Sequence, residues 1–421
     1  MAIQQVEGGV CAAKGLSNIQ QVEGGVCAAK GFQAAGVYCG IRKNKSKKDL
    51  ALIVSEVKAA CACVYTQNLV QGAPIAVTKA NVADGYASAI ICNSGNANTC
   101  NENGVEIATQ MCDLLGEALG IPASDVVVAS TGVIGKPLDI SPIASGIAPL
   151  IAALGDDSNA AAEAIMTTDV KKKEIAFSFT VGGKTCHIGG ICKGSGMIQP
   201  NMATMLGFVT TDVSISPAML QKALSADVPN SFNMVSIDGD TSTNDMVTIL
   251  ANGLAGNAMI TSEGADYDAF CAALSAVTQY LSRSIAGDGE GATKLIVCQL
   301  NGAADHASAV KLAKSVINSP LVKCAMFGAD ANWGRVLCAL GYAGVPTDVT
   351  KISVTFSSNA GSILVCQNGT GVDFSEELAK KVLSESEINI EIQLCDGSAS
   401  ATAFGCDLTY DYVKINGDYR T

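Results

Sequence analysis

The sequence is poor in the side chains that the commonest catalytic mechanisms use. Only two histidines, His187 and His306, occur among 421 residues, and no CxxC motif occurs despite 17 cysteines. A Ser-His-Asp or Cys-His mechanism would need one of these two histidines, which lie far apart in the chain. The closest cysteines form Cys61-Ala-Cys63, a spacing that provides no metal or redox framework. We therefore expect no metal site, and thiols that mostly behave as small buried apolar groups.

Charge and long apolar runs are also scarce. Charged residues make up 16% of the chain, and the formal net charge of −12 argues against nucleic acid or an anionic membrane as a partner. No apolar run reaches the roughly 18 residues of a membrane-spanning helix. The start, MAIQQVEGG, lacks the basic and apolar regions of a signal peptide. A hydrophobic content of 48% indicates a large buried core. We expect a cytoplasmic protein with free thiols.

A short duplication opens the chain. The segment IQQVEGGVCAAKG at 3–15 recurs unchanged at 19–31. A solenoid would repeat many times, so a recent duplication or an alternative start is the simpler interpretation. Residues 1–17 are therefore predicted to be dispensable.

Apolar periodicity predicts alternating strands and helices, which indicates an α/β protein. The run Lys171–Lys173 is interpreted as a solvated turn. The last segment alternates through Leu408, Tyr410 and Val413, which is typical of a strand. Helices are expected at 103–119, 158–166 with Ser158 as N-cap, 216–227, 266–285 and 375–383. Strands are expected at 49–64 around a turn, 126–135 ending in a glycine loop, 174–181, 295–300, 351–356 and 388–394. Residues 189–193 are expected to lead back to the glycine loop that begins at 194.

The stretch Lys193–Asp212, KGSGMIQPNMATMLGFVTTD, combines a glycine loop with an apolar run that contains Thr204. Glycines permit close backbone approach, but GSG lacks the spacing of a phosphate-binding P-loop. A threonine hydroxyl needs a base before it is a useful nucleophile. Cleavage between Ala203 and Thr204 would supply one, because a free α-amino group titrates near 7.7–8.0. From the residues alone, a buried strand threonine remains the alternative.

The same stretch closely resembles the self-cleaving segment of the ornithine acetyltransferase (ArgJ-type) family. Further strings resemble that family in the same order from about residue 18 onward: NSGNAN, STGVIG, DGDTSTND, DGEGATK and GADANWGR. The resemblance implies a layered αββα-type sandwich, similar to N-terminal-nucleophile hydrolases but differently connected. It also implies cleavage into an α chain, 18–203, and a β chain, 204–421, that associate as a heterotetramer of two α and two β chains.

The resemblance further implies a ping-pong acetyl transfer in arginine biosynthesis. Thr204 would take the acetyl group from N2-acetylornithine and pass it to glutamate, with no bound cofactor, as a glutamate N-acetyltransferase. Some members of the family also use acetyl-CoA as a donor, and others transfer only from acetylornithine. No motif in the sequence distinguishes the two, and we favour the bifunctional form, which adds amino-acid N-acetyltransferase activity. Thr131 and Gly132 would form the oxyanion hole, in which two donors face one oxygen. The implied substrate contacts are Thr167, Lys193, Thr204, Glu290, Asn416 and Thr421.

Each assignment has a structural alternative. Lys193 can pair with a substrate carboxylate or lie on a loop surface, and Glu290 can bind a substrate amine or simply be solvated. Met234 stands where the family usually has arginine, and Ala331 where it has proline. A threonine aminopeptidase or amidase that uses water as acceptor is the alternative enzyme class. A non-enzymatic binding protein would keep the 203–204 bond intact.

Overall fold

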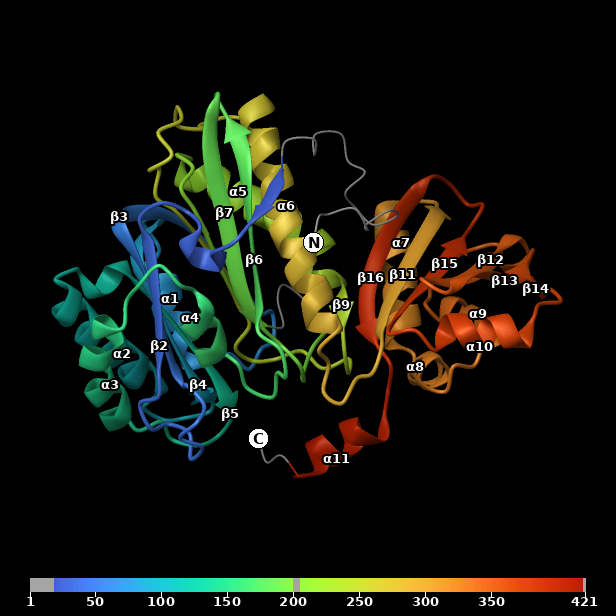
Figure 1. Cartoon of the computed structure of the whole chain (residues 1–421), viewed down its shortest axis with the longest axis horizontal. Helices are drawn as coiled ribbons and strands as arrows, with labels where there is room; N and C mark the ends of the chain where they lie inside the picture. The colour runs from blue at the N-terminus through green and yellow to red at the C-terminus, as the bar shows by residue number, and fades with distance from the viewer. Residues whose placement is uncertain (1–18, 200–204, 419–421) are drawn as a thin grey trace.

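The computed structural model describes residues 19–199 and 205–418, and these form two β-sheets with helices packed around them (Figure 1). The first sheet is mixed, with strand order β1-β6-β7-β8-β10-β3-β4-β5 and β2 paired to β3. Its strands are β1 (Gln20–Val22), β2 (Phe32–Val37), β3 (Leu50–Tyr65), β4 (Tyr86–Asn96), β5 (Val126–Val133), β6 (Lys173–Val181), β7 (Lys184–Lys193), β8 (Leu206–Thr211) and β10 (Met246–Ala251).

The second sheet is built entirely from the later part of the chain, in the order β14-β13-β12-β15-β11-β16-β9. Its central pair, β11 and β15, is parallel, and β16 runs antiparallel to β11 on the other side. The strands are β9 (Val235–Ser236), β11 (Leu295–Ala303), β12 (Ser353–Ser358), β13 (Gly361–Gln367), β14 (Thr370–Gly371), β15 (Glu387–Gln393) and β16 (Ala399–Cys406).

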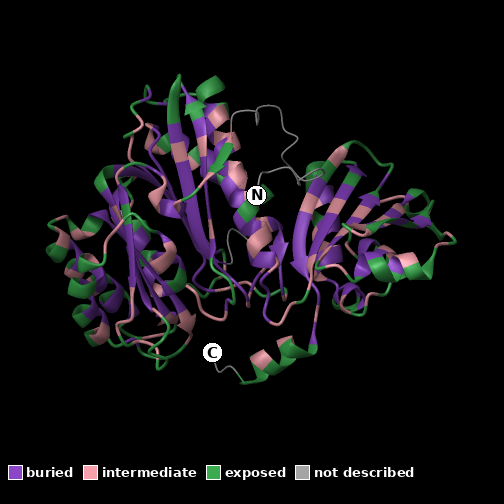
Figure 2. Ribbon diagram, viewed as in Figure 1, coloured by how far each residue is buried: buried purple, intermediate pink, exposed green. Residues whose placement is uncertain are grey.

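Helices cover these sheets, and the strands are the most buried elements (Figure 2). The long helix α6 lies between the two sheets and contributes Phe270, Val277 and Leu281 to a core shared by both (Figure 1). The helices are α1 (Ala73–Asn81), α2 (Gly104–Leu119), α3 (Ser141–Ala152), α4 (Asn159–Ala164), α5 (Pro217–Asp227), α6 (Ala265–Ala286), α7 (His306–Asn318), α8 (Pro320–Phe327), α9 (Trp333–Gly341), α10 (Glu376–Leu383) and α11 (Tyr410–Asp418).

The expected α/β class with layered sheets and helices is confirmed. Helices α2, α5, α6 and α10 begin and end close to their predicted bounds. Two of them have local side-chain caps: Ser216 accepts from Met219 N–H at the start of α5, and Ser375 accepts from Leu378 N–H at the start of α10. In the part of the chain that the structure describes, no helix is both long and apolar enough to cross a membrane.

Three local predictions are wrong. β3 is one continuous strand without a turn, because its first half pairs with β2 and β4 and its second half with β10. Ser158 does not cap α4; its hydroxyl donates to the Glu174 carboxylate instead. The final segment is helix α11 and not a strand, and Tyr410 and Val413 stand three positions apart, as neighbours on one helix face do.

Candidate active site

The two chain segments that flank the predicted cleavage bond are held by one loop. Thr204 and Ala203 themselves lie outside the described residues. On the N-terminal side, the backbone N–H groups of Met197 and Ile198 donate to Asp238 at 2.6 and 2.8 Å. On the other side, Met246 N–H donates to the Met205 carbonyl at 2.9 Å. The 238–246 segment therefore positions both approaches to the predicted nucleophile.

A small pocket opens between these segments and brings two predicted site residues together. Thr131 comes from the end of β5 and Lys193 from the end of β7, and Met205 directly follows Thr204. Thr131 and Lys193 are each only 8% exposed. The lining residues are Thr131, Lys193, Gly196, Met197, Ile198, Met205, Leu206, Ser242, Asn244 and Asp245. Residues from distant parts of the sequence thus meet where the sequence predicts the reaction to occur.

The predicted oxyanion hole lies near the end of strand β5, where the backbone conformation of residue 132 favours glycine. Gly132 has φ +131°, and a Cβ at this position would lie 2.4 Å from the carbonyl carbon of Gly95 on β4. The Asn244 side chain holds this region by donating to the carbonyls of Ser130, at 3.0 Å, and Ala97, at 2.5 Å. Rigid positioning of this kind is what an oxyanion-binding site requires.

A buried ion network supports the Lys193 loop, and it corrects one prediction. Lys173 was expected in a solvated turn, but it is 2% exposed and its ammonium contacts Asp169 at 2.7 Å and Asp288 at 2.6 Å. Burial favours the neutral form of Asp169, yet Lys173 and then Lys193 hold the pKa of that carboxyl well below its usual range. Burial lowers the pKa of Lys173, but Asp169 and Asp288 reverse this and raise it. Asp169 and Lys173 are therefore both charged at neutral pH.

Asp169 also connects Thr167 to the central loop. It accepts from Thr167 N–H at 2.9 Å and from Gly194 N–H at 2.7 Å. Thr167 is half-buried and does not line the pocket itself. Asp169 therefore links the backbone of Thr167 to the backbone of Gly194, the residue that follows Lys193.

Glu290 is buried between the central loop and the C-terminal helix. It is 7% exposed, and its N–H donates to the Ser195 carbonyl at 2.9 Å. A Cβ on Gly196, which lines the pocket, would lie 2.4 Å from the Glu290 carboxylate. Asn416 on α11 donates to the same carboxylate at 2.7 Å. The solvated-loop alternative for Glu290 is therefore wrong, whereas Thr421 lies outside the described residues.

Sequence reasoning assigned no role to three residues that organise this site: Lys173, Asp238 and Asn244. The string DGDTSTND contains two of them, so its match to a family string was a usable signal. Burial raises the pKa of Asp238, while the N–H groups that it accepts favour its charged form. Lys173 carried no such signal, because its two partners are separated from it by 4 and 115 positions.

The two departures from the family pattern lie in the core of the second sheet. Met234 is 2% exposed and Ala331 is 8% exposed, and both belong to the same apolar cluster. A thioether at position 234 packs in that core and supplies no charge. The 328–335 segment turns through Ala329, at φ 52°, before α9 begins.

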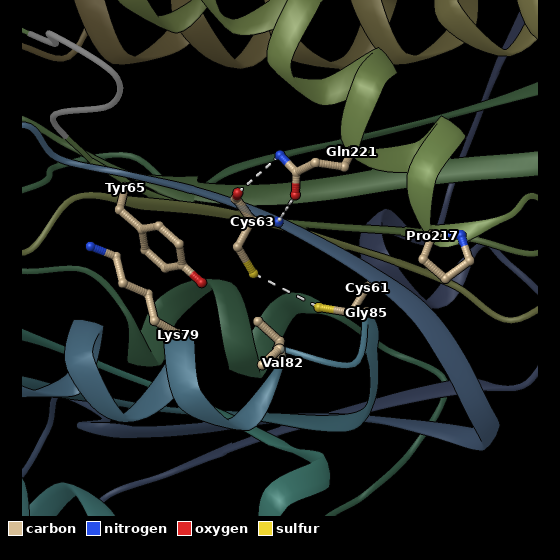
Figure 3. Close-up of a pocket in the computed structure, with 9 residues that line it drawn as sticks. Cys61, Cys63, Tyr65, Lys79, Val82, Gly85, Pro217 and Gln221 are labelled. Carbon is tan, nitrogen blue, oxygen red and sulfur yellow. Dashed lines mark hydrogen bonds between the residues drawn. The ribbon is translucent and has the colours of Figure 1, made fainter.

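A second, larger cavity of about 310 Å³ lies away from the predicted residues (Figure 3). It is lined in part by Cys61 and Cys63, whose sulfur atoms are 3.8 Å apart, and Gln221 hydrogen-bonds to the Cys63 backbone at 3.2 Å. Cysteines in the described part of the chain are free, and most of them are buried or half-buried as expected. Within the same residues, no three His, Cys, Asp or Glu side chains are grouped to hold a metal ion.

Comparison with known proteins places this chain in a family. The ArgJ family model matches residues 33–421, and the chain belongs to that family. The arginine biosynthesis bifunctional protein ArgJ of Symbiobacterium thermophilum is 51% identical over 393 residues, which cover 93% of this chain and 97% of that protein.

Two solved structures are also similar. One is the arginine biosynthesis bifunctional protein ArgJ of Bacillus halodurans, 45% identical, with a TM-score of 0.48, covering 50% of this chain and 98% of that one. The other is the ornithine acetyltransferase of Mycobacterium tuberculosis complexed with ornithine, 33% identical, with a TM-score of 0.41. It covers 44% of this chain and 100% of that one.

Proposed function

We propose that this protein is a self-cleaving acetyltransferase of arginine biosynthesis, which moves the acetyl group of N2-acetylornithine to glutamate. The names of its relatives, among them an ornithine acetyltransferase solved with ornithine, support this reaction. The observation that carries the proposal is the shared pocket of Thr131, Lys193 and Met205, the residue next to Thr204.

In the proposed maturation step, the Thr204 hydroxyl attacks the carbonyl carbon of Ala203. The C–N bond breaks, an ester forms, and water hydrolyses it to leave the Ala203 carboxylate and a free Thr204 α-amino group. The Gly132 N–H and the Thr131 hydroxyl stabilise the negative oxygen of the tetrahedral intermediate. The backbone bonds from Met197 and Ile198 to Asp238 support this proposal, since they restrain the chain just before the cut.

In the proposed transfer, the new α-amino group accepts the hydroxyl proton while Thr204 attacks the acetyl carbonyl. Ornithine leaves with that proton, and the amine of glutamate then attacks the acetyl-threonine ester. Lys193 pairs with the α-carboxylate of the substrate, Glu290 and Asn416 bind its amine end, and Thr167 and Thr421 complete the contacts. Nucleophile, base and oxyanion donors are all protein groups, so the mechanism uses no bound cofactor; acetyl-CoA serves as a second donor.

A denaturing gel and a product assay test the proposal together. We expect two fragments, 1–203 and 204–421, with the second beginning TMLGF, and a native mass that corresponds to two copies of each. We also expect N-acetylglutamate to form from N2-acetylornithine and glutamate. Thr204→Ala should abolish both cleavage and transfer, whereas Thr185→Ala, at an exposed hairpin position, should change neither.

The competing interpretations give different results in the same experiment. An aminopeptidase or amidase would be cleaved but would release acetate at the same rate with or without glutamate. A binding protein would remain a single band and transfer nothing. Either outcome would replace the proposal.

A further inference from the structure

The loop between β2 and β3 concentrates positive charge in an otherwise acidic protein. The chain has 27 lysines and arginines against 39 acidic residues. Within 42–48, RKNKSKK, all but two positions are basic: Arg42, Lys43, Lys45, Lys47 and Lys48. A local cluster of one sign raises the concentration of oppositely charged ligands near it.

This loop has a defined shape. The fully buried Asp49 carboxylate accepts from the backbone N–H groups of Cys39, at 2.6 Å, Gly40, at 3.3 Å, and Arg42, at 2.9 Å. Beyond them, the Asn44 side chain accepts from Ser46 N–H at 3.0 Å and from its hydroxyl at 2.7 Å. An Asx turn of this kind fixes the direction of the chain. The basic side chains therefore project from an anchored turn.

Three of the charges have no acidic partner in the part of the chain that the structure describes. Lys48 pairs with Glu163 at 2.7 Å, and the Arg42 guanidinium donates to the Met166 carbonyl. Lys43, Lys45 and Lys47 are exposed, and none of them forms an ion pair with a carboxylate of residues 19–199 or 205–418. Their positive charge remains available to a ligand.

The loop adjoins the candidate active site. A Cβ on Gly95 would lie 2.9 Å from Cγ of Arg42, and Gly95 is the cross-strand partner of Gly132. Arg42 also contacts Met166, the residue before Thr167. In Figure 1 this connection lies at the same end of the first sheet as the C-terminal end of β5. The loop thus reaches the edge of the candidate site through Arg42, and its lysines do not line the pocket.

We propose that Lys43, Lys45 and Lys47 bind the phosphate groups of the CoA portion of acetyl-CoA. This rests on the proposed function, in which acetyl-CoA is a second donor. Acetyl-CoA carries its acetyl thioester at one end and a diphosphate and a 3′-phosphate toward the other, whereas N2-acetylornithine has no phosphate. Lysine ammonium groups bind phosphate as mobile point charges. A cationic loop beside the pocket therefore distinguishes the two donors.

The test uses Lys43→Gln/Lys45→Gln/Lys47→Gln in the full-length protein. Its control is Lys184→Gln/Lys380→Gln/Lys381→Gln, at exposed lysines on the β6–β7 hairpin and on α10. We expect the loop variant to raise KM for acetyl-CoA about tenfold or more, since three exposed lysine–phosphate contacts are lost together. Transfer from N2-acetylornithine should stay within about twofold of the unmodified protein. Added salt should raise KM for acetyl-CoA more in the unmodified protein than in the variant.

Equilibrium binding of free CoA gives a second measurement that does not depend on turnover. The loop variant should bind CoA about tenfold more weakly, and the control variant should bind it like the unmodified protein. Equal CoA binding by both variants would overturn the inference, and so would an equal rise in KM for both donors. The protein could also transfer acetyl from N2-acetylornithine while neither using acetyl-CoA nor binding CoA. That result would overturn the inference but would still support the proposed transfer from N2-acetylornithine to glutamate.

Discussion

The side-chain amide of Asn416 donates a hydrogen bond of 2.7 Å to the carboxylate of Glu290, 126 positions earlier in the chain. A second bond reinforces the contact, since the Thr409 hydroxyl donates to the Gly291 carbonyl at 2.8 Å. Chain ends usually fray, but this helix is attached to the glycine-flanked glutamate of the candidate site. Residues 409–416 are therefore attached to the candidate site.

Replacing Asn416 tests whether this contact serves the substrate. We expect Asn416→Ala to lower kcat/KM for N2-acetylornithine by one to two orders of magnitude, because hydrogen bonds to charged groups contribute about 1.5–3 kcal/mol. Cleavage should continue, since it uses groups near Thr204. Steady-state kinetics beside a denaturing gel measure both. Lys414→Ala, at an exposed position on the same helix, is the control, and equal kinetics in the two variants would contradict the assignment.

Thr131 should act in both chemical steps. We expect Thr131→Ala to slow cleavage and transfer by about 10²–10³-fold each, the usual effect of losing one oxyanion donor. The time course of fragment appearance and kcat with saturating donor are the two measurements. Thr180→Ala, at an exposed position of β6, should leave both rates unchanged. Normal processing with normal turnover in Thr131→Ala would remove this residue from the mechanism.

Lys173 should be required mainly for stability. Lys173→Met leaves two buried carboxylates, Asp169 and Asp288, without their cation, and breaking a buried ion pair in this way costs about 3–5 kcal/mol. Urea unfolding should show that loss in the free energy of unfolding. Lys171→Met removes an exposed neighbouring lysine and should change it by less than about 0.5 kcal/mol.

Asp169 should make stability fall on acidification. Its folded-state pKa lies below the ordinary value, so the unfolded chain binds the proton more tightly than the folded protein does. The stabilising contribution is thus complete above about pH 4 and is lost as the pH falls further, through the folded-state pKa. Asp169→Asn should be less stable at neutral pH and show a shallower decline below about pH 4.

The measurement is urea unfolding at a series of pH values for the unmodified protein and for Asp169→Asn. The exposed Asp373→Asn variant provides the matched control and should follow the unmodified curve. Identical pH slopes in all three proteins would show that Asp169 does not contribute its charge to folding.

The cysteines should differ sharply in reactivity. Burial raises the pKa of Cys92 and of Cys298 to about 12, so both remain thiols near neutral pH and react slowly. The exposed cysteines should be alkylated first: Cys100, Cys324, Cys338 and Cys395. Mass spectrometry after brief labelling of the folded protein identifies them. Early modification of Cys92 or Cys298 would contradict the burial described here.

Local signals in the sequence were sufficient for much of the fold. Helix α5 follows from the Ser216-Pro217 start, and α2 from apolar positions at helical spacing, because caps and periodicity act over a few residues. The same signals failed at α11 and at Ser158. The Ser158 hydroxyl bonds to its tertiary partner Glu174 and does not cap α4. At α11 the apolar spacing was ambiguous between a strand and a helix.

The sequence by itself determined the family strings, the predicted cut between Ala203 and Thr204, and the candidate identities of Thr131 and Lys193, since these depend on residue type and order. Only the tertiary structure decided that Lys173 is buried against two carboxylates and that Asn416 reaches Glu290. The Lys173–Asp288 and Asn416–Glu290 contacts join residues more than a hundred positions apart, and their energy depends on burial and distance. Neither quantity is encoded in the spacing of neighbouring residues, so both appear only when the sheets and helices have packed.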